Sequence, residues 1–165
     1  MSRAKLLAVV IASASIIAAL AVLSSERPRP SLTVGAPGGG RVGVYLTSHA
    51  LSKPEIVSGF LEARAAGKLD ALVINVKNMH GEITYASEVP LARQIGASAG
   101  RIDFSLLLPE LHRRGFYVIA RQVVFFDPRL AHHLGRKTEW VPADNEAAVA
   151  YNLAIAEEVA SLGFD

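Results

Sequence analysis

The stretch Ala71-Leu72-Val73-Ile74-Asn75-Val76-Lys77 decides the fold class of this chain. It is mostly branched and apolar, which is typical of a strand buried on both faces of a parallel sheet. Two similar runs lie on either side of it, at residues 41–47 and 116–124. Helical patterns at about 52–67, 103–114 and 145–162 follow the three runs in turn. The alternation therefore predicts an α/β fold with a parallel sheet.

The ends of the predicted helices carry recognisable signals. Ser52-Lys53-Pro54-Glu55 fits a capping box with proline in the first turn. Asp103 is a suitable N-cap for the second helix, although Pro109 should kink that helix or delay its start. Gly163 closes the third helix and leads into Phe164-Asp165, which reads as the approach to another strand.

The length of the chain limits how much of a barrel it can form. A complete (β/α)₈ barrel takes about 250 residues, whereas residues 41–165 provide about three βα units. We therefore predict a partial domain over 41–165, namely the N-terminal part of a TIM-type barrel that is truncated at its C-terminus.

The N-terminal segment has the composition of an export signal. Leu6 to Leu23 is apolar apart from two serines and follows Arg3 and Lys5, and as a helix it would span about 27 Å. Residues 1–25 are thus predicted to be a signal peptide or an uncleaved hydrophobic membrane helix, followed by a Pro/Gly-rich linker over 26–40. Either reading places the domain outside the cytoplasm, secreted or anchored in the cytoplasmic membrane.

Charge and composition exclude several classes of function. The chain has 17 basic and 15 acidic residues, but four of the basic residues lie within residues 1–30. The domain therefore lacks the excess of positive charge that nucleic-acid binding requires. The absence of cysteine excludes disulfides and thiolate metal sites, while 51% hydrophobic residues exclude a disordered domain.

Polar residues occur late in each predicted strand. Alternation along the strands puts Tyr45, Thr47, Asn75, Lys77 and Arg121 on one face, near the carboxyl end of the sheet. Ligand sites of α/β folds lie at that end, so the pattern predicts a binding site. The alternative is that Lys77 and Arg121 pair with nearby acids, because a buried charge is costly without a partner.

Five segments in order carry a resemblance to a known family. They are residues 44–47 (VYLT), 73–78 (VINVKN), 83–92 (ITYASEVPLA), 117–128 (YVIARQVVFFDP) and 151–156 (YNLAIA). Together they resemble the "putative glycoside hydrolase domain" family of bacterial envelope proteins. The resemblance implies a TIM-barrel, glycosidase-like fold behind a signal peptide or anchor, with a polysaccharide or other glycan as partner.

The chain departs from that family in two ways. The resemblance implies Asp-Val-Lys-Asp on the second strand, where this chain has Asn75-Val76-Lys77-Asn78. It also implies a fourth strand with an Asp, a Tyr and an Arg, and this chain ends before it. We expect a glycoside hydrolase-like domain that is inactive as this fragment, or alternatively a non-catalytic carbohydrate-binding or wall-associated module.

Glycoside hydrolysis normally needs two carboxyl groups beside the scissile bond, and an amide cannot replace either. Glu82, just after the second strand, is the candidate general acid or base. Glu88 could instead fix its own loop, and Asp127 before Pro128 fits a turn or helix cap.

Other side chains suit sugar binding. Lys77 and Arg121 could donate hydrogen bonds to a sugar, and Trp140 could stack on its ring or close a loop over the sheet. His49 and His80 follow the first and second strands, so both are candidates for the rim of the site. His132-His133 has no evident third ligand, so we predict neither a metal nor a cofactor.

Overall fold

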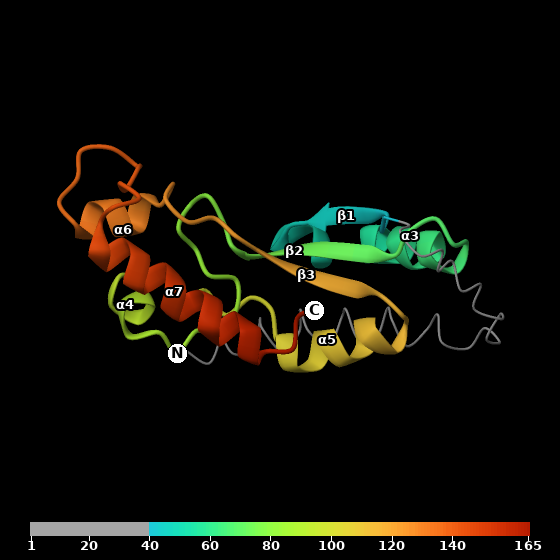
Figure 1. The fold of residues 1–165 in the computed structure, drawn as a ribbon. Coiled ribbons are helices and arrows are strands. Elements are labelled where there is room, and N and C mark those ends of the chain that lie inside the picture. The colour runs from blue at the N-terminus through green and yellow to red at the C-terminus, as the bar shows by residue number, and fades with distance from the viewer. Residues whose placement is uncertain (1–39) are drawn as a thin grey trace.

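A computed structural model describes residues 40–165, which form a three-stranded parallel sheet with helices packed against it (Figure 1). The strands are β1 (Gly43–Leu46), β2 (Ala71–Lys77) and β3 (Tyr117–Gln122), and β2 lies in the centre. The predicted α/β class with a parallel sheet is confirmed, and the arrangement is compatible with part of a TIM barrel. The predicted leader and nearly all of the predicted linker lie outside the described residues. Within residues 40–165, no helix is long and apolar enough to cross a membrane.

Six helices are described in residues 40–165. They are α2 (Ser48–Leu51), α3 (Pro54–Ala65), α4 (Pro90–Gln94), α5 (Phe104–Arg113), α6 (Pro128–His133) and α7 (Glu146–Ser161). The longer helices α3, α5 and α7 follow the three strands in turn, as predicted. The short helices α2, α4 and α6 lie in the connections after the carboxyl ends of β1, β2 and β3, where the sequence carries no long periodic pattern.

The predicted caps at Asp103 and Asp127 are confirmed, whereas the predicted capping box at Ser52 is not. Asp103, Asp127 and Asn145 each cap a helix, accepting hydrogen bonds from the amides of Ser105, Leu130 and Ala148. The predicted capping box at Ser52 is wrong, because α2 occupies the chain before it and Ser52 ends that helix, donating to His49 O. Helix α3 starts after Lys53 with no side-chain cap. Pro109 does not delay α5, which begins directly after Asp103.

One face of the sheet carries the core. Leu72, Ile74 and Val118 are fully buried there. The same hydrophobic cluster includes side chains of α3 and α5, namely Val57, Phe60, Leu61, Phe104, Leu107, Leu108 and Leu111. On the opposite face Tyr45 and Ile119 are 46% and 38% exposed. Helices therefore cover one face of the sheet, and its other face is open to solvent.

A β-bulge interrupts the pairing of β2 with β3 near its carboxyl end. Asn75 pairs with Arg121, but Lys77 pairs with the very next residue, Gln122. Adjacent residues of β3 point to opposite faces, so the bulge sends Asn75 and Lys77 to different sides of the sheet.

The last residue of the chain lies beside the outer edge of β3. The Asp165 amide donates to Val118 O at 3.0 Å, and the Asp165 carboxylate accepts from the Val118 amide at 2.7 Å. The residues predicted to approach another strand thus reach the edge where such a strand would pair.

Candidate functional site

Three polar side chains from three strands meet on the open face of the sheet. The Asn75 side-chain amide donates to the Tyr45 hydroxyl at 2.6 Å, and Arg121 donates to Asn75 Oδ1 at 2.8 Å. The Arg121 guanidinium also lies 5.3 Å from the centre of the Tyr45 ring. Strand pairing explains the meeting, because Tyr45 aligns with Val73 and Asn75 aligns with Arg121. The predicted convergence of Tyr45, Asn75 and Arg121 is observed, and we call these three residues the polar triad.

The polar triad retains hydrogen-bonding capacity toward solvent. Asn75 is buried, whereas Tyr45 and Arg121 are exposed. The one hydrogen bond from Arg121 to Asn75 uses only part of a guanidinium group with five N–H donors. The Tyr45 hydroxyl accepts from Asn75 and can still donate its own hydrogen. The buried amide therefore orients two exposed groups that can contact a ligand.

Lys77 does not lie with the polar triad, so the expectation that it shares their face is wrong. The β-bulge aligns it with Gln122, and both side chains reach the Asn152 Oδ1 atom on α7, at 2.9 and 3.0 Å. Lys77 Nζ also lies 2.7 Å from Asp127 Oδ2, with both side chains 0% exposed. The alternative interpretation, that Lys77 pairs with an acid, describes its position correctly.

The remaining predicted binding residues are scattered around the same end of the sheet. Thr47 is occupied as the N-cap of α2, where its hydroxyl accepts from the Ala50 amide at 3.0 Å. His49 is exposed on α2, and His80 is exposed in the turn after β2. That turn is held by Asn78, whose side-chain oxygen accepts from the amides of His80 and Glu82. These residues keep the positions after their strands that the sequence suggests, but none bonds to the polar triad.

Trp140 lies on the surface beside another aromatic ring. It is 62% exposed, and its ring packs edge-on against Phe126 at 5.0 Å between centroids. An isolated antiparallel bridge joins the same two residues. The exposed Trp140 ring suits stacking on the apolar face of a sugar.

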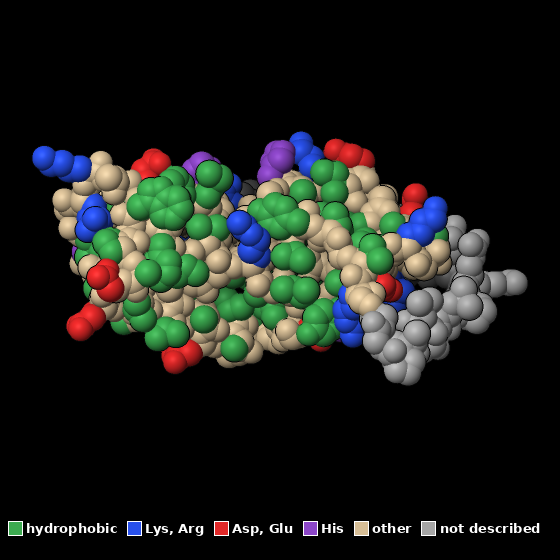
Figure 2. All heavy atoms as spheres, turned by 45° about the horizontal axis from the view of Figure 1, so that its top comes forward, with side chains coloured by type: hydrophobic (Ala, Val, Ile, Leu, Met, Phe, Trp, Pro, Cys, Tyr) green, Lys and Arg blue, Asp and Glu red, His purple; other side chains and the backbone are tan. Residues whose placement is uncertain are grey.

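Figure 2 shows a face of the molecule on which hydrophobic side chains gather across the middle, with basic side chains among them and acidic ones toward the margins.

The carboxylates near the carboxyl end of the sheet are already engaged. Glu82 forms an ion pair with Arg101, and Glu88 forms one with Arg93. Asp127 caps α6, as predicted, and is also the buried partner of Lys77. The polar triad itself holds an amide at the position where the resemblance implies an acid. The side chains of the polar triad thus supply hydrogen-bond donors and acceptors but no carboxylate.

Residues 43–137 match the model of a family described as "putative glycosyl hydrolase domain". That match spans more than half of the chain. The chain belongs to this family. The family resemblance drawn from the five sequence segments is therefore confirmed.

A solved structure has a similar fold to this family member. The crystal structure of a hypothetical protein from Ruminiclostridium thermocellum ATCC 27405 aligns with a TM-score of 0.67 and 26% sequence identity. The alignment covers 74% of this chain and 72% of that chain. No curated protein matches the chain.

The sequence analysis did not predict the buried network that Lys77 forms with Asp127 and Asn152, which Gln122 also contacts. Asp127 was expected only as a turn or cap, and Asn152 and Gln122 were not singled out. Burial lowers the pKa of Lys77, while its contact with Asp127 opposes that shift. A lysine inside a buried strand does signal a buried acid, but the sequence offers several acids and cannot say which one folds against it.

Proposed function

We propose that this chain contributes a glycan-binding site to a glycosyl hydrolase domain of TIM-barrel type that acts on an envelope or extracellular polysaccharide. The observation that carries the proposal is the polar triad, a hydrogen-bonded chain of hydroxyl, amide and guanidinium across three parallel strands. Such groups match the hydroxyl groups of a sugar, and the exposed Trp140 ring offers a second surface, suited to stacking. Membership of the family supports the same substrate class.

The proposal includes export of the domain. The apolar segment at residues 6–23, with Arg3 and Lys5 before it, supports either a cleaved signal or a membrane anchor. An extracytoplasmic location would place the domain beside envelope polysaccharide. Detection of the mature N-terminus by mass spectrometry after expression in a bacterial host would distinguish a cleaved leader from an anchor.

A second candidate function is a non-catalytic carbohydrate-binding or wall-associated module. The specific observation in its favour is that the triad holds Asn75 rather than an acid, while Glu82 is paired with Arg101. Hydrolysis by two carboxyl groups needs them roughly 5 to 10 Å apart across the scissile bond. Glu82 remains the residue proposed as general acid or base if the domain is catalytic.

Binding is the property to test first. The full chain would be run by affinity electrophoresis through gels containing envelope polysaccharides, beside the variants Arg121→Met and Arg113→Met. Arg121→Met should weaken retention about tenfold, since a hydrogen bond to a charged group is lost. Arg113→Met is the matched control, because Arg113 pairs with Glu110 on α5, a helix of the covered face. Equal retention of all three proteins would contradict the proposed site.

Catalysis is tested separately by the release of reducing ends from a bound polysaccharide. The glycosidase hypothesis expects turnover that falls at least a hundredfold in Glu82→Gln with binding preserved. Binding without any turnover would favour the non-catalytic module. Turnover that is unchanged in Glu82→Gln would remove Glu82 from the mechanism.

A further inference from the structure

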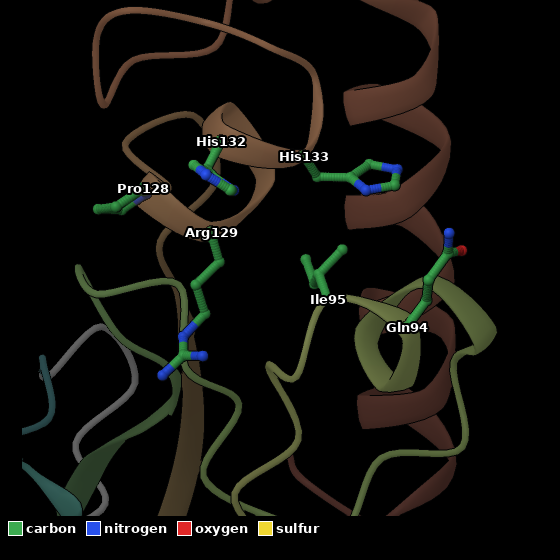
Figure 3. A pocket seen from close by; sticks show the side chains of 6 residues that line it. All are labelled: Gln94, Ile95, Pro128, Arg129, His132 and His133. Atoms are coloured by element: carbon green, nitrogen blue, oxygen red, sulfur yellow. The ribbon is translucent and has the colours of Figure 1, made fainter.

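A pocket with a volume of about 460 Å³ lies between α4 and α6 (Figure 3). It is lined by Gln94, Ile95, Pro128, Arg129, His132 and His133. The two helices belong to the connections that follow β2 and β3. Connections after the carboxyl ends of parallel strands are where α/β folds bind ligands. The pocket therefore occupies a position suited to a ligand, separate from the polar triad.

The ionisable side chains of the pocket are all nitrogen bases. Arg129, His132 and His133 line it, and no carboxylate does. Their spacing of three and four residues puts them on one face of α6. Figure 3 shows His133 extending from α6 toward Gln94 on α4. A pocket that combines a guanidinium with imidazoles selects a ligand with negatively charged oxygens, because guanidinium N–H groups match carboxylate and phosphate.

Contacts inside the protein position helix α6 and Arg129. Asp127 caps α6 through the Leu130 amide and is itself fixed by Lys77 inside the protein. Arg129 donates to Gly96 O at 2.9 Å, which ties α6 to the segment after α4 and leaves other N–H groups of the guanidinium for a ligand. Helix α6 and the Arg129 guanidinium are thus positioned before a ligand arrives, which reduces the ordering cost of binding.

We propose that this pocket binds the anionic group of an acidic glycan, either a carboxylate or a phosphate. The apolar side chains of Ile95 and Pro128 give the ring of the same sugar unit a surface to contact, and the pocket volume lies in the range of small-molecule sites. The glycan part of this proposal rests on the proposed function. The recognition of negatively charged oxygen atoms does not depend on the proposed function. The experiment below tests anion binding and glycan binding separately.

The test is titration calorimetry on the full chain at low ionic strength. The probes are a galacturonate trisaccharide, the neutral galactose trisaccharide, a galactose phosphate and inorganic phosphate. We expect at least one acidic sugar to bind about tenfold more tightly than the neutral one. Arg129→Met and the double variant His132→Gln/His133→Gln should each remove that preference, whereas Arg113→Met should keep it. The galacturonate and phosphate probes distinguish which anion is preferred.

Each outcome decides between defined alternatives. Equal binding of acidic and neutral sugars would overturn the pocket proposal and leave the proposed function standing. An acidic preference that survives both pocket variants would also overturn it. Phosphate binding that is lost in Arg129→Met, with no sugar bound, would support the anion pocket and contradict the glycan function. If Arg129→Met fails to fold, the histidine variant decides, because neither imidazole makes a hydrogen bond within residues 40–165.

Discussion

Lys77 Nζ lies 2.7 Å from Asp127 Oδ2, and both side chains are completely shielded from solvent. The contact joins the end of β2 to the first turn of α6. Asn152 on α7 completes the network by accepting from Lys77 and donating to Val124 O. One buried ion pair therefore fastens the connection after β3 to the centre of the sheet, and with it the pocket that α6 lines.

Replacing Lys77 by methionine should lower the free energy of unfolding by about 3 to 5 kcal/mol, because Asp127 would remain buried without its partner. Urea denaturation followed by circular dichroism measures the change. Lys68→Met is the matched control, since Lys68 is exposed after α3 and its loss should change stability by less than about 0.5 kcal/mol.

The double variant Lys77→Met/Asp127→Asn tests the reason for that loss. Asparagine keeps the N-cap of α6 but carries no charge, so the double variant should be more stable than Lys77→Met alone. If the double variant is less stable than Lys77→Met, the unpaired charge is not the cause.

Gly81→Ala should be more destabilising than an ordinary glycine substitution. Gly81 has a φ of 69°, and a Cβ atom there would overlap Asp127 Oδ1. Gly135→Ala is the matched control, because its φ is 66° but no atom lies within 4 Å of the added Cβ. We expect a loss of about 1 to 2 kcal/mol for Gly135→Ala and at least about 1 kcal/mol more for Gly81→Ala. Equal melting temperatures of the two variants would refute the clash.

Glu158→Ala should loosen the segment after β2. The Glu158 carboxylate accepts from the Tyr85 hydroxyl at 2.7 Å, the Ser87 hydroxyl at 2.6 Å and the Glu88 amide at 2.6 Å. Losing three acceptor contacts at once should cost about 2 to 3 kcal/mol. Hydrogen exchange of the Glu88 amide should accelerate, whereas Glu157→Ala, the exposed neighbour on α7, should leave it unchanged.

The stability of the protein should fall at alkaline pH. Burial raises the pKa of Tyr85 above its ordinary value of 10.0, and the hydrogen bond to Glu158 adds to the shift. Below about pH 10 the phenol is protonated in both the folded and unfolded states. Above it the unfolded chain releases a proton that the folded chain retains, so stability declines by about 1 kcal/mol per pH unit.

Tyr85→Phe should reduce that decline, as measured by urea denaturation at pH 9, 10 and 11. The remaining decline is expected to include Tyr151, because burial raises its pKa as well. An unchanged slope in Tyr85→Phe would show that Tyr85 does not titrate in this way.

Local pattern was enough to predict much of the fold. The apolar run at 71–77 is a central parallel strand, Asp103 caps its helix as predicted, and the periodic stretch at 145–162 contains helix α7. These features depend on neighbours in the chain. The short helices α2 and α4 were not predicted, and α6 was anticipated only as a turn or cap at Asp127, since a few residues carry too little periodicity to distinguish a turn of helix from a loop.

The sequence by itself determined the parallel α/β class and the meeting of Tyr45, Asn75 and Arg121, because the alternation of side chains along each strand follows from local pattern. It also determined the family, through five motifs in order. Only the tertiary structure decided where Lys77 lies. A bulge in the pairing of β2 with β3 reverses the face of a side chain, and its partner Asp127 is distant in sequence. Contacts of that kind depend on how separate segments pack together, which no local pattern of residues specifies.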